Sequence, residues 1–154
     1  NNNIILDNRL SSNTLNKYDL RSNLIEQKRE SNLNVFLWGY NFTNPIAKIE
    51  NIPFDEVEQA LSTLGTSYSD LQIFNSSNLE QKLNDLKSSL PKGYFTTYLY
   101  DLTNPSLLKS IKDVRNRSSF YSYDKFYRLK LIQDHDYNIL KYYFYVYKNK
   151  GTNP

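Results

Sequence analysis

The chain has 154 residues, of which 39% are hydrophobic and 23% charged, and its formal net charge is +3. This length and composition predict one globular domain with a substantial core. The chain has no Cys, which excludes disulfides, thiolate catalysis and Cys-based zinc sites, and no apolar run approaches the roughly 20 residues that cross a bilayer. Since Met is also absent, we interpret the chain as a piece of a larger protein.

The first part of the chain predicts a polar arm followed by a short helix. Asn1–Asn13 is rich in Asn and polar, which is typical of a loosely held arm. Thr14–Glu30 carries an imperfect helical stripe of apolar residues. We therefore expect an N-terminal arm or short helix over residues 1–33 and the main domain over residues 34–150. The stripe consists of Leu15, Leu20, Leu24 and Ile25.

Two strands and a helix follow. Val35–Tyr40 and Ile46–Ile52 are rich in β-branched and aromatic residues, and each predicts a strand. Pro53 ends the second strand, and acidic residues then mark a helix start, where the helix dipole favours negative charge. We predict this helix over Asp55–Leu64, ended by Gly65.

The second half predicts alternating strands and helices, and it shows no internal repeat. Leucines at spacings of three and four indicate helices, and alternation indicates strands. The predicted elements are a short strand over Leu71–Phe74, a helix over Leu79–Leu90, a strand over Tyr94–Leu102, a helix over Pro105–Val114 capped by Asn104, and two strands over Phe126–Ile132 and Ile139–Lys148 around a turn at Gln133–Asn138.

Charge and aromatic residues concentrate at the C-terminal end. Residues 109–150 carry a balance of +6, whereas the rest of the chain carries −3. Eleven of the 23 aromatic residues lie between Phe120 and Tyr147. Interleaved basic and aromatic residues suit single-stranded nucleic acid. A basic, Tyr-rich β-hairpin that simply packs has the same composition, so both interpretations stay open.

The strand Tyr94–Leu102 has two unlike sides. Side chains alternate across a strand, so Phe95 and Leu99 lie on an apolar side. The other side carries tyrosines and threonine. Aromatic rings in solvent are costly unless something stacks on them, so this side is expected to meet a partner. Its residues are Tyr94, Thr96, Tyr98 and Tyr100.

The predicted order resembles a known family. Strand–helix–strand–strand–helix–strand is the ferredoxin-like order. Lys92-Gly93-Tyr94 resembles the start of the strand-3 octamer of RNA recognition motifs, and residues 49–54 are similar to the end of their strand-1 hexamer. The resemblance implies an α+β, ferredoxin-like antiparallel sheet with two packed helices, an inserted helix and an extra C-terminal strand. The Asn/Ser-rich leader also resembles linkers of fungal Pumilio-repeat RNA-binding proteins.

In that family, aromatics at the third and fifth octamer positions and the second hexamer position stack on bases. Here the third position is Tyr94, and the fifth is Thr96, which cannot stack. The second hexamer position is Lys48 if strand 1 is the Ile46 segment, and Phe36 if it is the Val35 segment. Both registers stay open, and Tyr98 and Tyr100 on the same face would compensate for a lost ring.

The resemblance therefore implies weak binding of single-stranded RNA by a cytoplasmic regulator. An alternative is a protein-interaction or homodimerisation module with the same tyrosine face, and a second alternative is a secreted or surface pilin-like domain. The expected RNA-binding residues are Phe36, Lys48, Lys92, Tyr94, Tyr98, Tyr100, Arg128 and Lys130. The expected protein interface consists of Tyr143, Tyr145 and Tyr147.

Catalytic chemistry has little support in the sequence. His135 is the only His and stands between Asp134 and Asp136, but three adjacent residues converge poorly on one metal ion and are common in turns. No second His, Cys or Gly-rich phosphate loop is present. The acidic residues after Pro53 are explained by the helix start. We expect no enzyme activity, no cofactor, no metal and no membrane partner.

Overall fold

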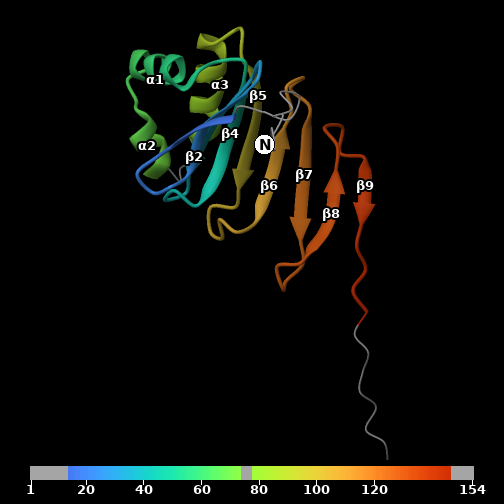
Figure 1. Cartoon of the computed structure of the whole chain (residues 1–154). Helices are drawn as coiled ribbons and strands as arrows, with labels where there is room; N and C mark the ends of the chain where they lie inside the picture. Colours follow the sequence, from blue (N-terminus) through green and yellow to red (C-terminus); the bar gives the residue numbers. More distant parts are fainter. Residues whose placement is uncertain (1–13, 74–77, 147–154) are drawn as a thin grey trace, which may run out of the picture.

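The computed structural model describes residues 14–73 and 78–146, which form one antiparallel sheet with a small helical layer (Figure 1). The nine strands stand in the sheet in chain order, and each pairs with the next. The strands are β1 Thr14–Tyr18, β2 Leu24–Arg29, β3 Asn32–Gly39, β4 Asn44–Glu50, β5 Tyr94–Tyr100, β6 Leu108–Lys112, β7 Ser118–Tyr123, β8 Leu129–Gln133 and β9 Ile139–Tyr142.

The prediction of a ferredoxin-like fold is therefore wrong. That fold needs two helical crossovers and a strand order that differs from the chain order. Here every neighbouring pair of strands is consecutive, antiparallel and mostly joined by short turns. The described helices are short and all lie between β4 and β5. They are α1 Phe54–Thr63, α2 Tyr68–Ile73 and α3 Leu79–Ser89.

The helices cover one face of the first half of the sheet (Figure 1). Val35, Ile49 and Phe95 are direct cross-strand neighbours on β3, β4 and β5, and all three are buried. Leucines of α1 and α3 pack over them and complete a single core. The buried helix residues include Val57, Leu61, Leu79, Leu83 and Leu86.

Beyond β5 the sheet continues as a single layer, visible on the right of Figure 1. No residue of β6, β7, β8 or β9 is buried. Most side chains of β6–β8 are half-buried, and their main neighbours are other strands of the sheet, apart from Lys112, whose ammonium binds the Glu80 carboxylate on α3 at 2.8 Å. Within residues 14–73 and 78–146, this region has the register and hydrogen bonds of a sheet, and no second layer covers it.

One turn recurs in this structure and reveals a repeat that the sequence did not. Asp113, Asp124 and Asp134 each accept hydrogen bonds from the backbone N–H groups two and four residues later, at 2.8–3.1 Å. The residue three positions after each Asp has a left-handed backbone, with φ of 61–63°. Asp19 closes the β1–β2 turn in the same way. The prediction that the chain has no internal repeat is therefore wrong.

Seven predicted elements are confirmed with shifted ends, and three others are wrong. Those confirmed are the strands near 35–40, 46–52, 94–102, 126–132 and 139–148 and the helices near 55–64 and 79–90. The helix over 14–30 is instead the β1–β2 hairpin, and the strand over 71–74 falls largely within α2, with residue 74 outside the described residues. The helix over 105–114 is a turn followed by β6. The strand predicted over 126–132 is β8, which begins only at Leu129 after a turn, and the strand predicted over 139–148 is β9, which ends at Tyr142. Strand β7 was not predicted.

Candidate functional site

The face opposite the helices carries the sequence-predicted tyrosines. Because Val35, Ile49 and Phe95 point into the core, the alternate residues Phe36, Lys48 and Thr96 point away from it. These three form one cross-strand row. We call this side the open face, and the residues that alternation places on it are Phe36, Lys48, Tyr94, Thr96, Tyr98, Tyr100, Lys109, Ile111, Ser119, Tyr121, Tyr123, Lys130, Ile132 and Lys141.

Two cross-strand pairs of one tyrosine and one isoleucine lie on the open face of β5–β8, and Ser119 on β7 stands opposite Ile111. Tyr98 pairs with Ile111, and Tyr121 pairs with Ile132. All four are half-buried. Cross-strand aromatic–β-branched pairs of this kind stabilise a sheet and fix its ring orientations. These contacts therefore help to hold β5–β8 together on the open face.

A cluster of phenols lies at one end of this surface. The Tyr40 ring packs edge-on against Tyr100, with centroids 5.2 Å apart, and its hydroxyl accepts a hydrogen bond from the Tyr100 N–H at 3.1 Å. Burial, assisted by neighbouring phenols, raises the pKa of Tyr100 to about 12. Burial also raises the pKa of Tyr123, whose hydroxyl donates to the Leu108 carbonyl at 2.9 Å. The cluster is therefore neutral at physiological pH and held in place by hydrogen bonds.

The two alternative assignments of strand 1, to the Val35 segment or to the Ile46 segment, place their candidate stacking residues side by side in the sheet. Phe36 and Lys48, the two candidates for one stacking position, are direct cross-strand partners. Tyr94 stands opposite Glu50, whose carboxylate binds the Lys48 ammonium. A polar depression of about 570 Å³ lies beside them. Its lining includes Asn32, Asn34, Lys48, Glu50 and Tyr94.

The predicted phosphate-binding cations are dispersed. Lys48 is ion-paired to Glu50, and the Arg128 Nε donates to the Asp124 carboxylate at 2.8 Å. Arg128 also lies over the Tyr145 ring, 3.9 Å from its centroid. Strands are spaced by about 4.8 Å, so β4 and β8 are separated by roughly 19 Å. Lys92, in the turn before β5, and Lys130, on β8, are exposed.

The predicted interface tyrosines after β9 are held against β8. The Tyr143 N–H donates to the Lys130 carbonyl at 2.9 Å, and the Tyr145 hydroxyl donates to the Leu129 carbonyl at 2.7 Å. The residues between and beyond them are far more exposed, at 85% for Phe144 and 88% for Val146. Tyr147 lies outside the described residues.

The sequence missed half of the open face. Ile111 was assigned to a helix, Tyr121 and Tyr123 lie on the strand that was not predicted, and Ile132 was assigned no role. The recurrent Asp at 113, 124 and 134 is the signal that locates these strands, because each of these residues begins a hairpin turn.

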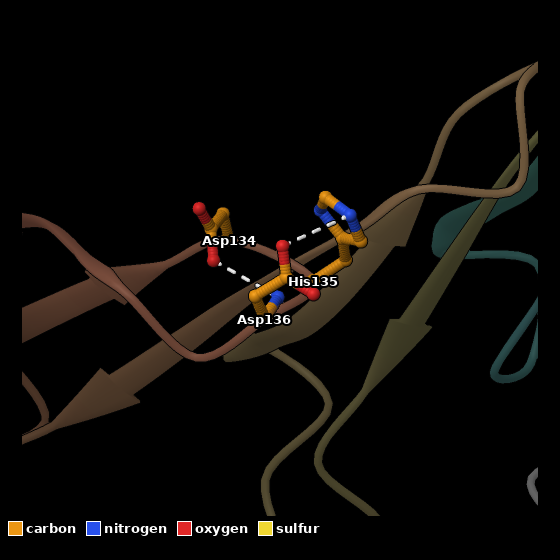
Figure 2. Close-up of side chains that lie close together, drawn as sticks. All are labelled: Asp134, His135 and Asp136. Carbon is orange, nitrogen blue, oxygen red and sulfur yellow. Dashed lines mark hydrogen bonds and ion pairs between the residues drawn. The ribbon is translucent and has the colours of Figure 1, made fainter.

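The His135 group is explained by turn geometry. Ligand atoms of Asp134, His135 and Asp136 lie within 4.8 Å of one another, and His135 Nε2 is 3.3 Å from the Asp136 carboxylate (Figure 2). The Asp134 carboxylate, however, accepts hydrogen bonds from the Asp136 and Asn138 N–H groups, both at 2.9 Å. The hydrogen bond from the Asn138 side chain is the main cause that lowers the pKa of Asp134. Since the equivalent Asp residues of the other turns make the same bonds without a His, the group needs no metal to explain it.

No protein-family model matches this chain, and no curated protein matches it either. Within the described residues, none of the helices is both long and apolar enough to cross a membrane.

Proposed function

We propose that this domain is a non-enzymatic protein-interaction module that binds a protein partner through the open face of β5–β8. The observation that carries the proposal is two half-buried cross-strand pairs, Tyr98 with Ile111 and Tyr121 with Ile132, on the open face. The second face of an antiparallel sheet is ordinarily polar where it meets water. The tyrosine–isoleucine pairs on this second face instead have the composition of an interface core, which is rich in Tyr, and the lysines of the same face would stand around them as a polar rim.

The electrostatics favour a protein over a nucleic acid as the partner. Binding to nucleic acid depends mainly on cations that neutralise phosphates. Two of the four predicted cations, Lys48 and Arg128, already bind carboxylates within the chain. Breaking such a pair to reach a phosphate would cost part of the binding energy. The phenols, by contrast, offer hydroxyl groups and flat rings to a protein surface.

Site-specific photo-crosslinking tests this proposal. The full chain, expressed in its own cells, would carry a photoreactive phenylalanine analogue at Tyr98 or Tyr121. A matched control carries it at Glu56, an exposed residue on α1 on the opposite side of the sheet. We expect nuclease-resistant protein adducts from positions 98 and 121 and none of the same mass from position 56.

Other outcomes of the same experiment contradict the proposal. Adducts that disappear on nuclease treatment, together with titratable binding of a labelled single-stranded RNA at low salt, would assign the open face to RNA. Identical adducts from all three positions, or no adducts, would show that the open face has no specific protein partner.

A further inference from the structure

The last strand of the sheet, β9, is an exposed edge strand that could pair with a strand of another chain. All four of its residues are exposed, and Ile139, Leu140 and Tyr142 are large and apolar. An exposed, apolar edge strand is a template for pairing with another strand unless charge, Pro or a covering element protects it. β9 has no Pro, and Lys141 is its single charged residue.

The hydrogen-bond pattern identifies which backbone groups point outward. The Tyr143 N–H donates to the Lys130 carbonyl on β8. In an antiparallel pair, alternate residues direct both backbone groups toward the same neighbour. The N–H and C=O groups of Tyr142 and Phe144 therefore point away from β8. Their rings lie together along this edge, with centroids 5.3 Å apart.

The opposite edge of the sheet, β1, is polar. On β1, Lys17 binds the carboxylates of Glu26 and Asp55, at 3.1 and 3.4 Å. Asn16 donates to the Tyr18 hydroxyl and accepts from Gln27. β1 is therefore a strand whose polar side chains bind groups of their own chain, whereas the side chains of β9 are mostly apolar, so the two edges are unlike. Pairing of β1 with β9 between copies would also be head-to-tail and would produce open-ended filaments.

We propose that two copies of this chain pair through β9 and the extended residues that follow it, antiparallel and about a two-fold axis at Tyr143. In this register Tyr142 of each copy lies opposite Phe144 of the other, so their outward N–H and C=O groups bond to each other. Lys141 then lies opposite Tyr145 rather than opposite the second Lys141, which avoids a repulsive pair. A two-fold contact closes on itself and stops at the dimer.

The pairing has a consequence for the open face. Strands that join in one continuous sheet keep the alternation of their side chains, so the open faces of the two copies lie on the same side. Dimerisation would then double the proposed protein-binding surface and add avidity. That gain rests on the proposed function, whereas the dimer itself does not.

The absence of native Cys permits a direct test of the register. Residues directly opposite each other in an antiparallel pair have Cα atoms about 4.5–5.5 Å apart, within the range that a disulfide spans. Tyr143→Cys should therefore give a disulfide-linked dimer under mild oxidation. Asn16→Cys on β1 is the matched control and should remain monomeric.

Sedimentation of the purified full chain tests the backbone contribution. Phe144→Pro removes the outward N–H of each copy, whereas Phe144→Thr keeps it and removes only the ring. We expect a micromolar monomer–dimer equilibrium for the native chain, and a dissociation constant at least about tenfold higher for Phe144→Pro than for Phe144→Thr. The far-ultraviolet circular dichroism spectrum verifies that both variants are folded.

Tyr98→Ser on the open face separates this proposal from the proposed function. It should leave the β9 dimer intact even where it abolishes photo-crosslinks to a partner. A native chain that stays monomeric at high concentration and gives no Tyr143→Cys dimer would overturn the β9 pairing. So would a dimer that Tyr98→Ser dissociates and Phe144→Pro does not, or assembly that grows without limit.

Discussion

The carboxylate of Glu26, on strand β2, accepts a hydrogen bond from the backbone N–H of Phe54 at 2.7 Å and so caps the start of α1. Glu26 is only 8% exposed, and the Lys17 ammonium lies 3.1 Å from its other oxygen. A negative charge at a helix N-terminus satisfies an otherwise unpaired N–H group and interacts favourably with the helix dipole. The contact joins the sheet to the helical layer through a polar group inside the core.

Glu26→Ala should therefore lower the free energy of unfolding by about 1–2 kcal/mol, the usual cost of losing a helix cap. Glu26→Gln keeps an acceptor oxygen for the Phe54 N–H but loses the charge that holds Lys17, so its cost should be smaller. Urea unfolding at neutral pH measures both. Equal stability of Glu26→Ala and the native protein would show that water replaces the carboxylate without cost.

The elements that the sequence predicted are those with local signals. α1 follows Pro53 with acidic residues in its first turn and ends before Gly65, which adopts the left-handed φ of +70°. β5 carries a clear alternation, and this alternation also placed Tyr98 and Tyr100 on one side of the strand. Such features depend on near neighbours in the chain, so one sequence suffices to read them.

The elements that were missed depend on partners distant in the chain or on turn chemistry. Leu107, Leu108 and Ile111 have helical spacing, and the Asn104 side chain does accept a hydrogen bond from the Ser106 N–H, at 3.2 Å. That contact closes one turn only, because Ile111 then pairs with Tyr98 and the segment becomes β6. Glu26 was likewise placed on a predicted helix, since no residue near it in the sequence indicates that its carboxylate caps α1 at Phe54.

The repeated turns predict a loss of stability in acid. Hydrogen bonds from following residues are the main cause that lowers the pKa of Asp113, Asp124 and Asp134 below the ordinary 3.8. A carboxyl group whose pKa is lower in the folded state stabilises the fold above its unfolded pKa and loses this contribution as pH falls. Unfolding free energy should therefore decrease below about pH 4.

Asp→Asn variants isolate this effect. Asp124→Asn keeps an oxygen that can accept the turn hydrogen bonds but does not titrate, so stability should depend less on pH between about 4 and 2. Glu56→Gln, on the exposed side of α1, is the control. Urea denaturation at each pH gives the comparison. An acid dependence in Asp124→Asn that equals the native one would exclude the turn carboxylate as its source.

Alkali should act on the phenol cluster. The pKa of Tyr100 is raised to about 12 from an ordinary 10.0, mainly by burial. A raised folded pKa stabilises the protein below the unfolded pKa, and the contribution is lost as pH rises through the folded value. Stability should hold to about pH 10 and fall toward pH 12. Ultraviolet absorbance of phenolate should show a late phase that Tyr100→Phe removes, and a late phase that persists in this variant would assign it to another tyrosine.

The hairpin repeat should tolerate removal of one whole unit. Asp113 and Asp124 occupy equivalent turn positions, so deletion of residues 114–124 joins Asp113 directly to Lys125 and rebuilds one Asp turn from the halves of two. β8 would then follow β6 in register. Because β6–β9 contribute no buried residue, the core around Phe95 loses nothing. We expect a chain that unfolds cooperatively with nearly native stability and a smaller denaturant dependence, since less surface is buried on folding.

Deletion of residues 118–122, about half a unit, is the control. It leaves two turns without a strand between them and should expose the open face to aggregation. Circular dichroism and urea unfolding compare the two deletions, and equal behaviour would show that the turns are independent features rather than units of one repeat.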